Sequence, residues 1–174
     1  MKKIEITGKR QKDKIEKAND PNNKNIVAKR DCMKNIDESY FDYKIQKELI
    51  NRLYLNDENM PYKNELLREI DKKITSYKTQ DINKNKYNGN NITREETIEK
   101  LVASKLKCYY CKSNVLLFYN KVRDMEQWTL DRIDNNINHS ESNVIIACLK
   151  CNLQRRCQNK DKFLFTKQLK IVKE

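Results

Sequence analysis

Four cysteines form the pattern with the clearest chemical meaning in this sequence. Cys108 and Cys111 make one CxxC pair, and Cys148 and Cys151 make a second pair that runs directly into Asn152. A CxxC pair places two thiolates on one tight turn, so two pairs brought together supply the four sulfurs of a closed tetrahedral zinc site. The thirty-six residues between the pairs are too many for a bare finger loop. We therefore expect a structural Zn²⁺ ion that frames a small folded insert.

The composition narrows the class of protein. The chain has 174 residues, which suffices for one domain or for one small domain with extensions, and a formal net charge of +12. It has no apolar run of the roughly 20 residues that cross a bilayer, and its start lacks the apolar core of a secretory signal. These features predict a soluble intracellular protein without a membrane partner, and a reducing compartment favours zinc over disulfides. The excess positive charge predicts a nucleic-acid partner, although an A/T-rich genome would explain part of the composition.

Three regions are expected to position the cysteines and the insert. Residues 1–30 are rich in Lys, Asn and Asp and predict a flexible basic arm. Residues 31–91 are expected to form a helical hairpin, because apolar residues recur at helical spacing and Pro61 is well placed to begin the second helix. The stretch 79–91 has no periodicity and is predicted to be a linker. Residues 92–174 then hold the zinc pairs and a C-terminal basic helix.

The pattern of the last region predicts an α+β fold. Residues 93–96 (Thr-Arg-Glu-Glu) form a capping box that should open a helix leading to the first CxxC pair. Two strand-like stretches follow at 114–119 and 127–133. Residues 143–156 are predicted to be a helix or a turn entering one. Strand, strand and helix around a metal make a ββα arrangement.

These residues resemble a known family. The run 130–135 (Leu-Asp-Arg-Ile-Asp-Asn), then Asn143, and then Cys148-Leu-Lys-Cys151-Asn152 resemble the HNH (ββα-metal) endonucleases. The nearest subtype is the zinc-framed one, which includes phage recombination-junction endonucleases and HNH-like proteins of large DNA viruses. The resemblance covers about residues 92–160. It implies a viral protein found in the cytoplasm or nucleus of a host cell, or in the virion.

The resemblance also implies roles for individual residues. The four cysteines would bind the structural zinc, Asp131 and Asn152 would hold a catalytic Mg²⁺ or Mn²⁺ ion, and Asn143 would pin the loop. One carboxylate and one amide oxygen leave most of the coordination sphere of such an ion to water and substrate phosphate. The ion could then stabilise the leaving 3′ oxygen while a nearby base deprotonates the attacking water.

The sequence departs from the family at that base. The family has a histidine directly after the metal-binding aspartate, whereas this chain has Arg132. Arginine stays protonated and cannot take a proton from water, but it could clamp the scissile phosphate. The one histidine of the chain is His139, whose ordinary pKa of about 6.5 suits a general base. A backbone-bonding role in the loop and metal ligation are the alternatives for His139.

Two further arginines are candidates for binding nucleic acid. Arg155 and Arg156 follow the last zinc cysteine and are expected to contact phosphates, with a solvated helix face as the alternative. Trp128 is expected to pack in the core rather than to stack on a base. Cys32 and Cys157 lie outside the zinc pattern and are expected to be ordinary thiols.

The sequence thus predicts a metal-dependent DNA endonuclease of HNH type. Its substrate is expected to be DNA, with branched and nicked forms included, and RNA is the less favoured substrate. A homodimer is compatible with the family, and the expected helical hairpin could mediate it. The alternative is a catalytically inactive zinc module that binds DNA or RNA structurally, since Arg132 takes the position of the base. A zinc-stabilised protein-interaction domain would explain the cysteines but neither the charge nor the pairing of Asp131 with Asn152.

Overall fold

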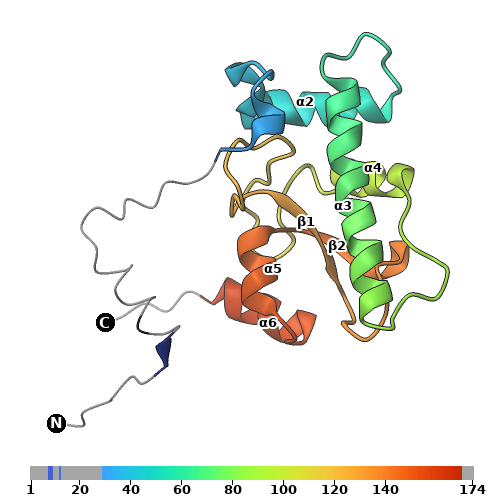
Figure 1. The fold of residues 1–174 in the computed structure, drawn as a ribbon, viewed down its shortest axis with the longest axis vertical. Coiled ribbons are helices and arrows are strands. Elements are labelled where there is room, and N and C mark those ends of the chain that lie inside the picture. Colours follow the sequence, from blue (N-terminus) through green and yellow to red (C-terminus); the bar gives the residue numbers. More distant parts are fainter. Residues whose placement is uncertain (1–7, 10–11, 13–28, 170–174) are drawn as a thin grey trace.

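The computed structural model describes residues 8–9, 12 and 29–169 (Figure 1). The basic arm predicted for residues 1–30 therefore lies almost entirely outside the described residues. The described chain combines helices with a small two-stranded antiparallel sheet, in agreement with the predicted α+β class. None of its helices is long and apolar enough to cross a membrane. The regular elements are α2 (Tyr43–Tyr54), α3 (Lys63–Asn83), α4 (Arg94–Ala103), β1 (Trp128–Arg132), β2 (Val144–Cys148), α5 (Leu149–Arg155) and α6 (Lys160–Gln168).

The strands β1 and β2 and the helix α5 follow one another as a ββα unit. The strands pair from Trp128 opposite Cys148 to Arg132 opposite Val144, and α5 begins directly after β2. This differs from the predicted strands. Residues 114–119 form only isolated bridges, and the second strand lies at 144–148, where a helix was expected. The reason is the apolar, largely β-branched start of β2 (Val-Ile-Ile-Ala-Cys), which fits a buried pleated surface better than a helix.

The capping box predicted before the first CxxC pair is present. The Thr93 hydroxyl accepts a hydrogen bond from the Glu96 amide at 3.2 Å, and the Glu96 carboxylate accepts one from the Thr93 amide at 2.8 Å. The helix that it opens, α4, ends at Ala103, and Leu106 lies between this helix and the first CxxC pair. Leu106 is nevertheless fully buried, and it brings the chain into the core just before the first zinc cysteine.

The two N-terminal helices belong to the same core as the ββα unit. Helix α2 begins at Tyr43, because the Asp42 side chain caps it. It packs against α4, and in the view of Figure 1 it runs across the upper end of α3. Buried apolar residues make one cluster from Met33 to Phe163. The predicted boundary near residue 91 therefore does not separate two cores.

Helix α3 covers the edge of β1 that β2 leaves free. It continues to Asn83, through the first part of the predicted linker. The Tyr77 hydroxyl accepts a hydrogen bond from the Leu130 amide at 3.1 Å, and Lys73 Nζ donates one to the Trp128 carbonyl. All five residues of β1 are consequently buried. The side chains of α3 thus bond the backbone of the strand edge that β2 leaves unpaired. This packing places α3 beside the residues that the sequence predicted as site residues.

Candidate metal centre and polar pocket

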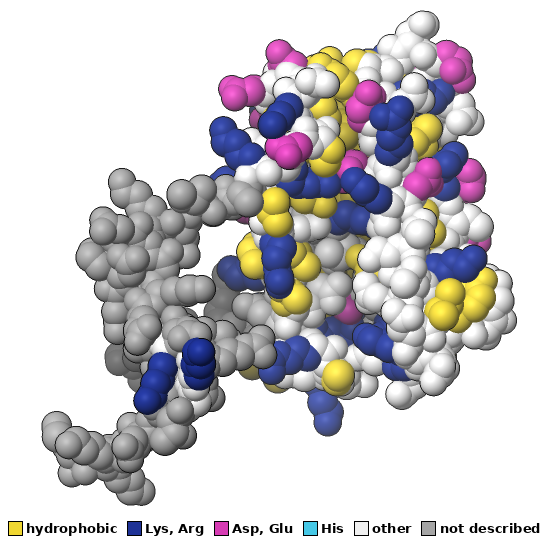
Figure 2. All heavy atoms as spheres, viewed as in Figure 1, with side chains coloured by type: hydrophobic (Ala, Val, Ile, Leu, Met, Phe, Trp, Pro, Cys, Tyr) yellow, Lys and Arg dark blue, Asp and Glu magenta, His cyan; other side chains and the backbone are white. Residues whose placement is uncertain are grey.

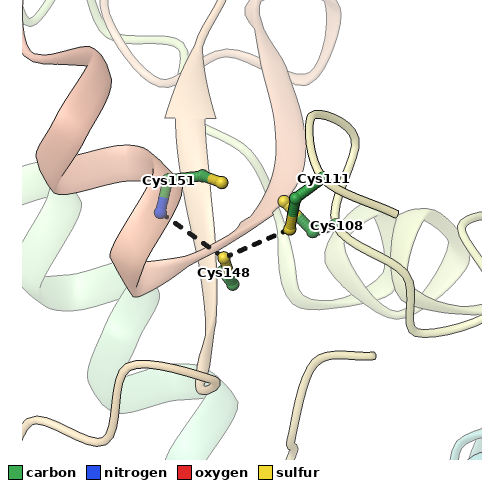
Figure 3. A group of neighbouring side chains, drawn as sticks. All are labelled: Cys108, Cys111, Cys148 and Cys151. Carbon is green, nitrogen blue, oxygen red and sulfur yellow. Dashed lines mark hydrogen bonds between the residues drawn. The ribbon is translucent and has the colours of Figure 1, made fainter. Parts of the chain in front are cut away.

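The four zinc-site cysteines converge in the structure (Figure 3). Their sulfur atoms all lie within 4.8 Å of one another, and the Cys111 and Cys148 sulfurs are 3.9 Å apart. A tetrahedral zinc ion with Zn–S bonds of about 2.3 Å holds its sulfurs about 3.8 Å apart, whereas a disulfide needs about 2 Å. In the part of the chain that the structure describes, this is the single cluster of three or more His, Cys, Asp or Glu side chains with the geometry to hold a metal ion. The cluster fits zinc.

Local structure explains how the two pairs meet. The first pair lies on a turn after α4, and the Tyr109 amide in this turn donates a hydrogen bond to the Ile146 carbonyl of β2 at 2.9 Å. Cys148 ends β2, and its sulfur accepts a hydrogen bond from the Cys151 amide at 3.4 Å in the first turn of α5. Burial raises the pKa of the Cys151 thiol to about 12. A bound zinc ion would instead stabilise all four sulfurs as thiolates.

Most of the other predicted site residues line one polar pocket. The pocket has a volume of about 460 Å³ and lies between the end of α3, β1 and the end of α5. Lys84 and Lys86 add positive charge to its wall. It therefore joins candidate catalytic groups to a basic surface that suits a phosphate. The predicted residues that line it are Asp131, Arg132, His139, Asn152 and Arg156.

Asp131 is buried and bonded on both oxygens. Oδ1 accepts a hydrogen bond from Arg155 Nη1 at 2.8 Å, and Oδ2 accepts one from the Tyr110 hydroxyl at 2.5 Å. Burial raises the pKa of the Asp131 carboxyl, and these two contacts oppose that shift. Asn152 Nδ2 donates to the Thr129 hydroxyl at 3.1 Å. Asp131 and Asn152 both line the pocket, and each carries a hard oxygen donor of the type that divalent ions prefer.

Arg155 does not lie where the sequence predicted. It was expected on the helix surface as a phosphate contact, but its side chain is only 1% exposed. Besides Asp131, it donates to the backbone carbonyls of Arg132 at 2.5 Å and Ile133 at 3.0 Å. A guanidinium needs several acceptors when it is buried, and the end of β1 provides them. The neighbouring Arg156 is exposed and lines the pocket.

His139 is held by a residue of α3. Its Nδ1 lies 2.8 Å from Asp81 Oδ2, and its ring lies 4.6 Å from the ring of Tyr77 at an angle of 31°. Asp81 also forms an ion pair with Arg132 Nη1 at 3.1 Å. Burial lowers the pKa of His139 from its ordinary value, and Asp81 partly offsets this shift. The imidazole is therefore neutral at neutral pH.

Asn143 joins both sides of the loop between the strands. Its Oδ1 accepts a hydrogen bond from the Asp134 amide at 2.9 Å. Its Nδ2 donates to the carbonyls of Asp134 at 3.0 Å and Asn138 at 2.8 Å. These bonds hold the loop that carries His139 against the start of β2.

Two residues of the site were not anticipated from the sequence. Asp81 was assigned to the linker 79–91, because only continuation of α3 places it beside the pocket. Tyr110 lies inside the first CxxC pair, where attention falls on the cysteines, and nothing local indicates a bond to Asp131. Comparison of the chain with protein-family models, curated proteins and solved structures found no match.

Proposed function

We propose that this protein is a metal-dependent endonuclease that hydrolyses phosphodiester bonds in DNA with HNH-type chemistry. The observation that supports the proposal is the pocket that Asp131, Asn152 and His139 all line. These residues offer one carboxylate, one amide and one imidazole, which are the groups that a one-ion hydrolysis needs. The cysteine cluster supports a structural zinc ion that keeps β2 and α5 in place.

Each group in the pocket has a role in this proposal. His139 takes the proton from the attacking water, because burial keeps its imidazole neutral at neutral pH. Asp131 and Asn152 would hold a Mg²⁺ or Mn²⁺ ion, which supplies Lewis-acid stabilisation of the phosphate and the leaving oxygen. Arg132 and Arg156 orient the scissile phosphate from opposite ends of the ββα unit.

The distribution of charge supports an anionic substrate at this face. In Figure 2 acidic side chains lie in the upper part of the view, over α2, α4 and the first half of α3, among Lys and Arg, whereas the region near the end of α3, α5 and α6 shows mainly Lys and Arg. Branched and nicked DNA remain part of the proposal, as does a homodimer.

The ion pair between Asp131 and Arg155 favours a second candidate function. A guanidinium 2.8 Å from the carboxylate opposes the binding of a further cation there. If that opposition prevails, the protein is a catalytically inactive zinc module that binds DNA or RNA through the same basic face.

The deciding experiment is a cleavage assay on supercoiled, linear and four-way-junction DNA and on RNA, with Mg²⁺, with Mn²⁺ and with a chelator. The wild-type protein should cut DNA only with the ion. Asn152→Ala should abolish most of the cleavage that the ion supports. His139→Gln should lower the rate by about 10²–10⁴-fold. Asn152 is a better target than Asp131, because it is half-buried and its loss leaves no buried charge unpaired. Binding without cleavage of any substrate would favour the inactive module.

A further inference from the structure

Asp81 is a buried carboxylate near the end of α3 that contacts two residues of the pocket. Its side chain is 0% exposed. Oδ1 accepts a hydrogen bond from Arg132 Nη1 at 3.1 Å, and Oδ2 accepts one from the His139 backbone amide at 2.7 Å. The same Oδ2 lies 2.8 Å from His139 Nδ1. Burying a carboxylate costs free energy unless it is paired and hydrogen-bonded, so these contacts are needed for α3 to pack here.

The contact with the ring determines which nitrogen of His139 carries the proton. An ionised carboxylate only accepts hydrogen bonds, so Nδ1 must donate, and the neutral imidazole then has its lone pair on Nε2. Since His139 lines the pocket, Nε2 is the ring nitrogen left to act as a base. Tyr77, which packs against the imidazole, lies four residues before Asp81 and thus on the same face of α3. One helix face therefore sets both the tautomer and the plane of the ring.

The charged groups around His139 show what Asp81 contributes. Burial is the largest cause of the lowered pKa of His139, and Arg132 on β1 and Lys84 after the end of α3 lower it further. Asp81 is the group that raises it. Tyr77 packs against the imidazole, and burial raises the pKa of its hydroxyl. Asp131, Lys86, Arg156 and Cys157 line the same pocket. Without the Asp81 charge, the causes that disfavour a protonated imidazole would act unopposed.

We propose that Asp81 is a positioning residue of the catalytic site, which holds His139 in the Nδ1-protonated tautomer and at a fixed distance from Arg132. This inference rests on the proposed function, in which His139 is the general base. It makes α3 part of the site, although α3 lies outside the region that resembles HNH endonucleases. The helical N-terminal part of the described chain then has a direct role in the chemistry.

The test uses the full chain and the fact that it contains one histidine. Ring ¹⁵N NMR of wild-type protein should show the proton of neutral His139 on Nδ1. In Asp81→Asn the Nε2-protonated form should appear and the titration midpoint should fall. The cleavage rate should drop about 10- to 100-fold. The acid limb of its pH profile should move to lower pH, because a base with a lower pKa stays unprotonated there.

Asp71→Asn is the matched control, because Asp71 lies on the same helix in an exposed ion pair with Arg94, and it should change neither spectrum nor rate.

The outcomes separate this inference from the proposed function. A wild-type spectrum with the proton on Nε2 overturns the role of Asp81, whether or not the variant folds. So does a folded Asp81→Asn protein with an unchanged tautomer, even if its rate falls, because the role would then be structural. If the spectra change as expected but wild-type protein cuts no substrate, the nuclease assignment fails. The conclusion that Asp81 sets the tautomer of His139 remains valid.

Discussion

At the scale of single residues, a buried network beneath the pocket determines how Asp131 can act. Arg155 neutralises one carboxylate oxygen, and Tyr110 donates to the other from inside the first CxxC turn. A buried ion pair contributes little net stability, but removing one partner leaves an uncompensated charge. The network therefore opposes the rise in the pKa of Asp131 that burial causes, and it connects the carboxylate to the turn that carries the first two cysteines of the cluster.

Replacing Arg155 should destabilise the protein far more than replacing its neighbour. Arg155→Met leaves the buried Asp131 unpaired and should lower the free energy of unfolding by about 3–5 kcal/mol. Arg156→Ala removes an exposed side chain and should change it by less than about 0.5 kcal/mol. Urea denaturation of the two variants measures both values. Similar small losses for both would mean that Asp131 is not held by this pair in solution.

The pH dependence of cleavage should follow His139. A general base works in its unprotonated form, so the rate falls as pH drops through its pKa in the folded protein. Burial lowers that pKa below the ordinary 6.5. The midpoint of the acid limb should therefore lie below pH 6.5. Measuring kcat/KM from about pH 5 to about pH 8 tests this, and an acid limb centred above 6.5 would contradict it.

At the scale of elements, the first CxxC turn and α3 hold the pocket from two sides. The turn is fastened to β2 by Tyr109 and to β1 by Tyr110. Helix α3 is fastened to β1 by Lys73 and Tyr77. Burial lowers the pKa of Lys73 to about 7, and nearby Arg30 adds to the shift, so this lysine is a poorly solvated cation at the strand edge. Asp131 and Arg132 therefore reach their positions in the pocket only when both elements are packed against β1.

Loss of the bound metal should therefore unfold the whole core in one cooperative transition. Cys148→Ser should abolish stoichiometric zinc and lower Tm by roughly 10 °C or more, because structural zinc contributes folding free energy directly. Since the core is continuous from Met33 to Phe163, we expect a single transition rather than separate melting of α2 and α3. Metal analysis with calorimetry measures both effects. Cys157→Ser, at an exposed thiol, is the control. Full stability without zinc would show that the cysteines are not a metal site.

At the scale of the whole molecule, the net charge of +12 is unevenly spread. On the face shown in Figure 2, acidic side chains lie in the upper part of the view among Lys and Arg, whereas the lower part shows mainly Lys and Arg. Lys84, Lys86 and Arg156 line the pocket. Such an arrangement should draw a polyanion to the pocket and keep it away from the opposite end. It also implies binding that is general for phosphate backbones rather than selective for a base sequence.

Affinity for duplex DNA should consequently fall steeply with salt. Each neutralised phosphate contributes about −0.9 to the slope of log K against log salt concentration. Arg156→Ala should reduce the magnitude of the slope by about 1 and weaken binding equally for unrelated sequences. Arg94→Gln is the control, since Arg94 is already paired with Asp71 at 2.6 and 2.8 Å. Fluorescence anisotropy at several salt concentrations provides the measurement, and binding that does not depend on salt would argue against a phosphate-binding face.

The sequence by itself was sufficient where the determining interactions are local. The CxxC spacing indicated which four cysteines would converge, because two residues between thiolates set a turn. The capping box from Thr93 to Glu96 was equally clear, because both of its bonds lie within one helical turn. The α+β class also followed from the patterns, although the strand expected at 114–119 did not form and the strand at 144–148 was assigned as a helix. A short apolar run is compatible with a strand or with a helix, and the choice depends on the segments against which it packs.

Only the tertiary structure decided which polar side chains are buried and with whom. Arg155 has the same local context as Arg156, yet one side chain enters the core and the other faces the pocket. Asp81 acquires its partners from residues 51 and 58 positions further along the chain. The free energy of a buried charge depends on the groups that surround it, and those groups are assembled by packing α3 against β1. No periodicity along the chain encodes that packing, so these contacts could be known only from the folded protein.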